Sequence, residues 1–487
     1  MNKSIVSTGG HLIDTNCKFQ TGNLYQSNSV VYSCTLNQTD LGKNANKFYI
    51  MQVIVNGPQY VVFIRYGRIG ETGTINYKEF SSESPAKSFF EKQFRTKTGN
   101  AWLHKDNFEK KSGHYFLTEI ECIEESSESS ESEISVSTEC KLDKRIVHFL
   151  ELISNQTYMK NSLVQLEIDT DKMPLGKISQ TQIDKGYIIL DKINKNMNQK
   201  NMLIELSSEF YTLIPMATGR RQPPVINSSE LLGKYVNLLN ELSQMVYGSK
   251  TSTKKSTNDS ALMKLYDELQ TEFIPLDTTD VMYSILVDYL KHSKAPTHNF
   301  KYDVLDIFQI ERPHEQKLYD KYSKKIKNKT LLFHGTRISN LIGILKNGLV
   351  VDPSKLGINV SITGKMFGMG LYFANSCSKS INYCGYDSSD NIACLFVSEV
   401  ALGKMLKKTD SDSSLTADRM PSGYHSTWGM GASSFTEYDC YDDGSQIPSG
   451  NLSKRNDGTR YGLLYDEFIV YHEEQIRLRY IIKLKIH

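Results

Sequence analysis

An acidic stretch limits what this chain can fold into. Residues 121–140 carry seven Glu and no Lys or Arg. Like charges at this density repel one another and leave too few apolar side chains to build a core. We therefore expect a linker there, and we favour a solvated spacer over a specific docking tail. The chain is then divided into separate domains, and its 487 residues suffice for about three.

The segment before this linker is predicted to be β-rich. Between residues 25 and 120, runs of β-branched and aromatic residues are separated by Asn, Gly and Pro. A helix is expected to begin near Pro85. Residues 41–115 hold 12 Lys and Arg against 6 Asp and Glu, a basic balance that suits nucleic-acid binding but also an ordinary soluble domain. Residues 1–24 are polar, and we expect a disordered arm.

The region after the linker is predicted to contain a helical and a mixed domain. Residues 141–260 read as mostly helical with a trailing polar linker, because apolar residues recur there at helical spacing. Residues 261–487 alternate strand-like apolar runs with helical segments, and the last run is expected to be a strand. The sequence thus predicts a multi-domain α+β fold.

Composition argues against several classes of protein. The eight cysteines form no C-x-x-C pair, so we expect no metal site and no zinc finger. No apolar run approaches the ~20 residues of a membrane helix, and no secretory signal is apparent at the N-terminus. We expect a soluble intracellular protein with no membrane partner.

Three short motifs in the last third of the chain carry chemistry. His334 follows a strand-like run and precedes a Gly. Gly368 and Gly370 precede Tyr372, with Tyr383 shortly after, a pattern that suits a clamp around a flat ring. Glu467 and its neighbour Asp466 interrupt an apolar strand. Burial of a carboxylate there costs free energy unless the group is paired or serves a reaction. Each motif alone also fits an ordinary structural role.

In this order, the three motifs resemble the DNA-dependent branch of the poly(ADP-ribose) polymerase family. His334 lies in its H-G-T/S motif, Tyr372 in G-x-Y-F-A followed by S-K-S-x-N-Y-C, and Glu467 in Y-x-E-[YF]-I-V-Y. The resemblance extends from about residue 25 to the end. Upstream, residues 166–179 and 209–215 resemble the helical regulatory domain, 295–312 the entry to the catalytic domain, and 66–73 with 97–102 the WGR domain. The missing zinc-finger pattern resembles the shorter members.

The resemblance implies an ADP-ribosyltransferase that uses NAD+. Glu467, His334 and Tyr372 would be its catalytic residues, with Glu467 on the ribose and acceptor hydroxyls and His334 on a ribose hydroxyl. Tyr372 and Tyr383 would sandwich the nicotinamide ring. The remaining substrate contacts implied are Gly335 and Ser380 on the carboxamide, with Lys379 and Asn340 in support.

The resemblance also implies regulation by DNA breaks. The signature Trp of the WGR domain is Tyr66 here, and Arg68 is retained. Tyr66, Arg68, Lys97 and Lys105 are the candidate contacts to broken or nicked DNA, although Arg68 also suits a contact with the helical domain. The helical segment 141–248 would block the NAD+ site until DNA binds.

The sequence constrains the length of the ADP-ribose product and the acceptor proteins less than it constrains the enzyme class. The M-F-G-x-G segment favours polymer over single ADP-ribose units, so the alternative is a mono-ADP-ribosyltransferase with the same DNA dependence. Lys365 and Val350 depart from the residues common in the family and leave the acceptor and adenosine contacts open. Acceptor proteins, the chain itself and an accessory specificity factor are the protein partners implied, and the location implied is nuclear.

Overall fold

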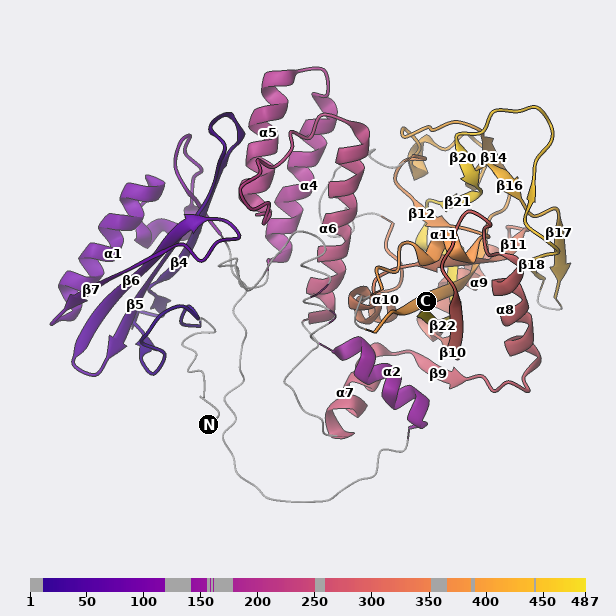
Figure 1. The fold of residues 1–487 in the computed structure, drawn as a ribbon, viewed down its shortest axis with the longest axis horizontal. Helices are drawn as coiled ribbons and strands as arrows, with labels where there is room; N and C mark the ends of the chain where they lie inside the picture. Colours follow the sequence, from indigo (N-terminus) through magenta and orange to yellow (C-terminus); the bar gives the residue numbers. More distant parts are fainter. Residues whose placement is uncertain are drawn as a thin grey trace. The chain divides into compact units, whose positions relative to one another are not determined.

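The computed structural model divides into two compact units, one of residues 1–135 with 163–235 and the other of 136–162 with 236–487. Figure 1 labels their helices and strands. The expected multi-domain α+β fold is confirmed. The acidic segment 121–140 lies outside the described residues. Those are 12–118, 142–155, 158, 161, 178–249, 259–351, 366–386, 390–441 and 444–487.

A twisted antiparallel sheet forms the first part of the first unit. Its strands are ordered β7-β6-β5-β4-β8, and β1 pairs with β5. Helix α1 packs on the sheet through Ala86, Phe90 and Phe94, and it ends at Gly99, whose positive φ of 72° suits a glycine. The bounds are β1 Asn23–Leu24, β2 Gln26–Ser27, β3 Val30–Val31, β4 Ser33–Asp40, β5 Ala45–Asn56, β6 Gln59–Arg68, β7 Thr74–Phe80, α1 Glu83–Thr98 and β8 Phe116–Leu117.

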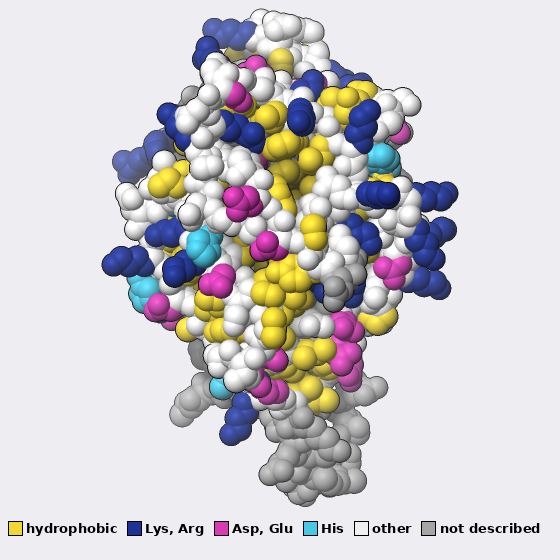
Figure 2. Space-filling view, turned by 90° about the vertical axis from the view of Figure 1, so that its right-hand side faces the viewer, with side chains coloured by type: hydrophobic (Ala, Val, Ile, Leu, Met, Phe, Trp, Pro, Cys, Tyr) yellow, Lys and Arg dark blue, Asp and Glu magenta, His cyan; other side chains and the backbone are white. Residues whose placement is uncertain are grey.

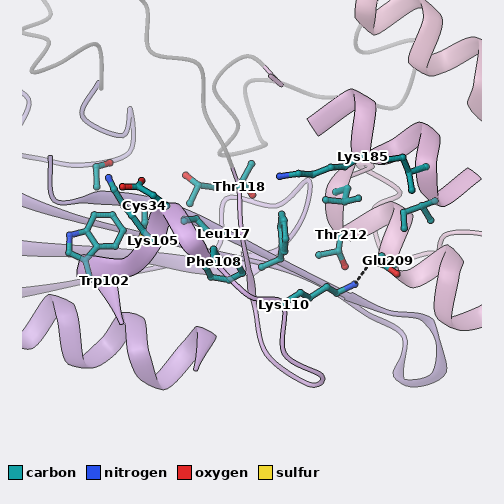
Figure 3. Close-up of a pocket in the computed structure, with 17 residues that line it drawn as sticks. Cys34, Trp102, Lys105, Phe108, Lys110, Leu117, Thr118, Lys185, Glu209 and Thr212 are labelled. Atoms are coloured by element: carbon teal, nitrogen blue, oxygen red, sulfur yellow. Dashed lines mark ion pairs between the residues drawn. The ribbon is translucent and has the colours of Figure 1, made fainter. Parts of the chain in front are cut away.

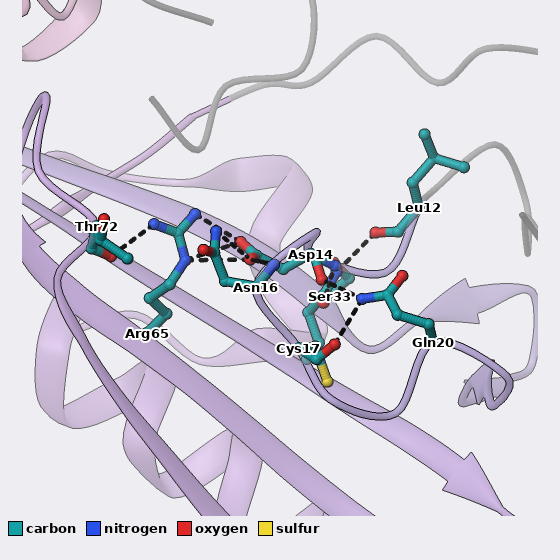
Figure 4. Close-up of polar contacts among 9 residues, drawn as sticks. Leu12, Asp14, Asn16, Cys17, Gln20, Ser33, Arg65 and Thr72 are labelled. Carbon is teal, nitrogen blue, oxygen red and sulfur yellow. Dashed lines mark hydrogen bonds and ion pairs between the residues drawn. The ribbon is translucent and has the colours of Figure 1, made fainter. Parts of the chain in front are cut away.

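The N-terminal segment is ordered where the sequence suggests an arm. Ile13 and Cys17 are buried, and the Asp14 carboxylate accepts hydrogen bonds from Arg65 Nε at 3.1 Å and Nη2 at 2.7 Å (Figure 4). Both charged side chains are almost fully buried, so each depends on the other. The expectation of a disordered arm over residues 1–24 is therefore wrong for residues 12–24. Composition misses this because one ion pair and two apolar side chains hold the segment.

Helices α4 (Gln180–Lys195) and α5 (Lys200–Leu213) belong to the same unit as this sheet. The backbone amide of Thr39 donates to Thr212 Oγ1 at 3.0 Å, and that of Leu41 donates to Ser208 Oγ at 3.0 Å. Asn46 donates to the carbonyl of Met216 at 3.1 Å. These bonds join the end of β4 and the start of β5 to α5 and the loop that follows it.

The second unit is built on two main sheets. The larger is ordered β17-β18-β11-β13-β22-β10-β9, and the smaller β12-β21-β15-β14. The C-terminal strand is confirmed as β22, Ile476–Ile486, between β13 and β10. The other strands are β9 Glu272–Pro275, β10 Tyr302–Glu311, β11 Lys329–Gly335, β12 Leu371–Phe373, β13 Ile392–Ala401, β14 Met405–Lys408, β15 Ser426–Gly429, β16 Gly431–Ser434, β17 Glu437–Cys440, β18 Ser445–Ser449, β19 Ser453–Lys454, β20 Leu463–Tyr465 and β21 Glu467–Val470.

The described part of the predicted helical region 141–260 contains five helices, α2, α4, α5, α6 and α7, and they pack in two places. Unlike α4 and α5, the helices α2 and α7 share the core of the second unit, where Phe149 contacts Phe273 and Phe308. Helix α6 begins in the first unit and continues into the second. The bounds are α2 Lys144–Ser154, α6 Ser229–Ser249, α7 Asp259–Leu269, α8 Val281–His292, α9 Pro313–Ser323, α10 Leu341–Asn347 and α11 Cys377–Ile381.

The surface is mixed in character. On the face seen in Figure 2, Lys and Arg lie mainly toward the edges, and hydrophobic side chains gather along the middle. Within the described residues, no helix is long and apolar enough to span a bilayer. Across the same part of the chain, His, Cys, Asp and Glu nowhere form a group of three or more that could hold a metal ion.

Candidate active site

The three motifs meet where the two sheets of the second unit join. Phe333 of β11 exchanges backbone hydrogen bonds of 2.8 and 3.0 Å with Ala374, just after β12. Strand β12 in turn pairs with β21. His334, Tyr372 and Glu467, one from each of these strands, are thereby brought to one place although they span more than a hundred residues of sequence.

His334 is fixed by its neighbour strand. Its Nδ1 lies 3.0 Å from the carbonyl oxygen of Tyr372. A carbonyl only accepts, so Nδ1 carries the proton. In the neutral imidazole Nε2 is then the acceptor. The half-buried ring can therefore offer an acceptor atom to a hydroxyl.

The two tyrosines differ in exposure. The Tyr372 hydroxyl accepts from the amide of Phe367 at 2.9 Å and donates to the carbonyl of Gly368 at 2.9 Å, so the hydroxyl end of its ring is fixed. Burial raises the pKa of Tyr372, and the phenol stays neutral. Tyr383 is 62% exposed. Burial and the charge of Glu467 raise the pKa of Tyr383. One ring is packed in place, and the other has a large exposed surface that a ligand can cover.

Glu467 forms an ion pair with Lys379 of α11. Their Oε1 and Nζ atoms are 2.9 Å apart, and both side chains are largely buried. Lys379 also donates to the carbonyl of Tyr465 at 2.9 Å. Burial lowers the pKa of Lys379, and the charge of Glu467 opposes that shift. This pairing holds the carboxylate of Glu467 in one position.

The second carboxylate of the motif has a different partner set. Asp466 is fully buried, and it accepts from the amide of Gly431 at 2.7 Å and from the Ser434 hydroxyl. Arg455 lies 3.3 Å from both of its oxygens. Asp466 therefore anchors the loop and strand around β16, whereas Glu467 faces Lys379. Asp466 lies between β20 and β21, whereas Glu467 is the first residue of β21, and the two carboxylates have separate partners.

The remaining predicted substrate residues divide into two groups. A side chain at Gly335 would overlap the carbonyl of Ser380, so only glycine permits this approach of β11 to α11. Ser380 donates to the carbonyl of Phe333 at 3.2 Å and lies beside the site. Asn340 is buried and donates to Thr336 at 3.0 Å, a contact that orders the turn after β11.

A contact that the sequence did not reveal lies three residues after His334. Arg337 Nε is 2.8 Å from Glu241 Oε2 of helix α6. Burial raises the pKa of Glu241, and Arg337 opposes that shift. Glu241 lies in an ordinary helical stripe, so no pattern marks it. In the sequence, Arg337 is recognisable only as a charged residue directly after the H-G-T motif.

The candidate DNA contacts lie in the first unit, Tyr66 and Arg68 on strand β6, Lys97 at the end of α1 and Lys105 in the 3-10 helix Trp102–Asn107. Tyr66 is 38% exposed and stacks on Tyr49, with ring centroids 5.8 Å apart. Lys97 lies over the same Tyr49 ring at 4.9 Å, whereas Lys105 lies over Trp102 at 4.6 Å. The structure thus brings Tyr66 and Lys97 together and places Lys105 at a separate ring.

Arg68 contacts the loop after α5. It donates to the carbonyls of Gly219 at 2.5 Å and Arg221 at 3.0 Å, and to the carbonyl of Asn44 at 3.1 Å. Of the two roles considered for Arg68, the structure contains the contact with the helical segment. Its guanidinium links two parts of the first unit.

The chain matches the models of three known domain families. The chain matches the family description "Poly(ADP-ribose) polymerase catalytic domain" over residues 281–486, "Poly(ADP-ribose) polymerase, regulatory domain" over 140–273 and "WGR domain" over 32–109. The catalytic match contains all three motifs. The regulatory match includes α2 and α7 as well as α4, α5 and α6.

Individual proteins that are similar to this chain carry the same family name. Poly [ADP-ribose] polymerase 2-A of Oryza sativa is 35% identical over 94% of this chain and 70% of the relative. Poly [ADP-ribose] polymerase 2 of Homo sapiens is 33% identical over 100% and 85%. Poly [ADP-ribose] polymerase 1 of Xenopus laevis is 32% identical over 98% of this chain but 48% of the relative.

The chain therefore belongs to the poly(ADP-ribose) polymerase family. It is an NAD+ ADP-ribosyltransferase, and that prediction is confirmed. NAD+ is the substrate of its catalytic domain.

Proposed function

We propose that this protein is activated by DNA breaks and transfers ADP-ribose from NAD+ to proteins, itself included, extending the first unit into a polymer in DNA damage signalling. The observation that carries the proposal is the position of Glu467, anchored by Lys379, at the junction that also holds His334 and Tyr372. The location that fits this function is the nucleus.

Glu467 serves the bond exchange. The nicotinamide–ribose bond of NAD+ breaks, nicotinamide leaves with the bonding electrons, and the acceptor oxygen forms a new bond to the ribose carbon while losing its proton. Positive charge builds on the ribose during this exchange, and a fixed carboxylate stabilises it. The carboxylate also accepts hydrogen bonds from the ribose and acceptor hydroxyls. Lys379 positions Glu467 through their ion pair.

The other residues hold the nicotinamide riboside half of NAD+. The cationic nicotinamide ring lies between Tyr372 and the exposed Tyr383. Because Ser380 donates its proton to Phe333, its oxygen is left to accept from the carboxamide N–H, beside the backbone of Gly335. His334 accepts from a ribose hydroxyl. Asn340 supports this site through the turn it orders.

The sheet of the first unit is the DNA reader in this proposal. Tyr66 stacks on an exposed sugar or base at a strand end, and Lys97 and Lys105 contact phosphates. Arg68 of β6 couples DNA binding to the helical segment, because it donates hydrogen bonds to Asn44 beside β5 and to the loop that follows α5.

Helix α6 restrains the NAD+ site in the absence of DNA. Its Glu241 pairs with Arg337, and Arg337 belongs to the turn that carries His334 and Gly335. A shift of α6 therefore acts on the nicotinamide half of the site. This is a coupling between two sites through one helix.

The test is automodification with labelled NAD+, with and without nicked duplex. We expect DNA-stimulated nicotinamide release and a ladder of products on a gel. Single-unit products would favour the mono-ADP-ribosyltransferase alternative, and the M-F-G-x-G segment at 366–370 supports polymer. A protein that bound broken DNA and left NAD+ intact would be a silent scaffold, contrary to the proposal.

A further inference from the structure

Lysines gather where helix α9 ends and strand β11 begins (Figure 1). Residues 320–329 carry five Lys against one Asp, a net charge of +4. Ile326 is buried in this segment and packs with Tyr319 and Ala401, so the turn is fixed to the domain. The lysines around it have exposed side chains, and they are Lys321, Lys324, Lys325 and Lys327.

The loop after β13 brings a further lysine to the same place. The amide of Leu402 donates to the carbonyl of Asn328 at 2.9 Å, and Asn328 Nδ2 donates to the carbonyl of Gly403 at 3.1 Å. Lys404 follows directly, and its ammonium lies 4.6 Å from the ring centre of Tyr424. We call the following five residues the lysine patch: Lys321, Lys324, Lys325, Lys327 and Lys404.

Carboxylates do not compensate the lysine patch. Across the part of the chain that the structure describes, none of its five side chains forms an ion pair. In the cleft of the first unit that Figure 3 shows, by contrast, Lys110 pairs with Glu209 at 3.3 Å. Uncompensated lysines that gather on one surface create a positive potential, and such a surface attracts an anionic polymer.

Strand β11 connects the lysine patch with the active site. It begins at Lys329, two residues after Lys327, and ends at Gly335 beside His334. A strand of this length spans about 20 Å. The patch and the catalytic residues therefore lie at opposite ends of one strand, and a flexible polymer can occupy both places at once.

We propose that the lysine patch binds the poly(ADP-ribose) that this enzyme makes, an inference that rests on the proposed polymer formation. Every ADP-ribose unit carries a diphosphate, and lysines commonly bind phosphates. Successive units present these groups to Lys324, Lys325 and Lys327. An adenine stacks on Tyr424, since aromatic side chains accept any base.

Binding at the lysine patch keeps a growing chain near the site that extends it. A chain held about 20 Å from His334 returns to the active site at a high effective concentration, as the second of two linked binding modules does. The patch therefore lengthens the product and takes no part in the bond exchange itself.

Binding of purified, end-labelled poly(ADP-ribose) to the full-length chain without NAD+ tests the patch. The triple variant Lys324→Gln/Lys325→Gln/Lys327→Gln should bind the polymer roughly tenfold more weakly. The slope of log Kd against log salt concentration should fall by about 2, or ~0.7 for each lost phosphate contact. The control removes the same charge from exposed lysines elsewhere in the second unit, Lys264→Gln/Lys291→Gln/Lys301→Gln, and should bind the polymer normally. Melting temperatures of both variants separate lost binding from lost folding.

Product length is the second readout. In automodification, the triple variant should release nicotinamide at the wild-type initial rate and give shorter chains than the control. Equal polymer binding by the triple variant and the control would overturn the proposal. Weaker binding of nicked duplex with unchanged polymer binding would assign the patch to DNA instead. Because the polymer in the binding assay is supplied, single-unit products together with the expected loss of binding would contradict polymer formation and support the patch.

Discussion

The two units of this molecule present their functional residues in different ways. In the second unit, short motifs far apart in sequence converge on one junction of two sheets, and each side chain has a defined partner such as Lys379 for Glu467. In the first unit, the candidate DNA contacts are spread over two rings and a loop. A reaction needs particular atoms in particular positions, whereas a surface for a charged polymer can be assembled from many positions.

The difference also concerns regulation. The first unit joins its sheet to α5 and the loop that follows it through bonds at Thr39, Leu41 and Arg68. Among the described residues of the second unit, the charged pair of Arg337 with Glu241 joins α6 to the turn after β11. We infer that catalytic activity is sensitive to single substitutions in the second unit. The DNA response depends instead on several weaker contacts in the first unit.

The largest effect of a single substitution is expected for Glu467→Gln in the second unit. We expect it to retain NAD+ binding and to lose roughly a hundredfold or more of transfer activity, because the amide cannot supply the negative charge opposite the ribose. Labelled-NAD+ transfer and a separate NAD+ binding titration measure the two effects. Glu437→Gln, at an exposed carboxylate of β17, is the control. Normal automodification by Glu467→Gln would remove the role assigned to this residue.

The next largest effect is expected in the first unit. Tyr66→Ala should weaken binding to nicked DNA, whereas Arg68→Ala should retain most binding and lose stimulation, because Arg68 bonds the loop after α5. The double variant should lose stimulation by roughly tenfold. Fluorescence anisotropy and nicotinamide release separate the two. Stimulation should also fall steeply with salt. Full stimulation of the double variant would contradict the account.

A smaller effect is expected at helix α6. Glu241→Lys places a like charge beside Arg337 and should raise DNA-independent activity several-fold, because it replaces the attraction within this partly buried pair by a repulsion. Glu241→Gln keeps the shape of the side chain and removes only the attraction, so it should raise DNA-independent activity less than Glu241→Lys. Restored repression in the double variant Glu241→Lys with Arg337→Glu would confirm the pair. Unchanged basal activity in Glu241→Lys would refute it.

Deletion of the whole helical segment 141–248 is less informative than these point changes. Helix α2 lies within it, and α2 supplies Phe149 to the core that contains Phe273 and Phe308. The deletion would therefore expose part of the catalytic core. Activity lost in that way would say nothing about restraint of the NAD+ site.

The smallest effect is a pH dependence at Lys379. Burial lowers the pKa of Lys379, so its proton is lost at a lower pH than for an ordinary lysine near 10.4. The ion pair with Glu467 exists below that pKa and weakens as pH rises through it, and kcat should fall with it. Lys379→Arg should move this decline to higher pH, because arginine stays charged. The same alkaline decline in Lys379→Arg would exclude this group as its cause.

The sequence was sufficient for the fold class, the family and the enzyme class, because the motifs are specific and the strands strongly apolar. It did not predict the order of residues 12–24, since that order depends on the pairing of Asp14 with Arg65, 51 positions away. It also gave no means of dividing the helices between two cores. The pairing of Glu241 with Arg337 depends on three-dimensional placement alone.

Roles for individual site residues stay predictions. The structure places His334, Tyr372, Glu467, Lys379, Ser380 and Gly335 at one junction. It gives Asn340 a partner within the turn. It also divides two adjacent carboxylates that the sequence could not tell apart, with Asp466 bound to Arg455 and Glu467 to Lys379.

The most direct test of the central claim is release of nicotinamide from NAD+ by the purified chain, measured with and without nicked duplex and repeated with Glu467→Gln. The account predicts turnover that rises on addition of the duplex and that the variant largely loses. Intact NAD+ under both conditions, or equal turnover by the variant, would contradict it.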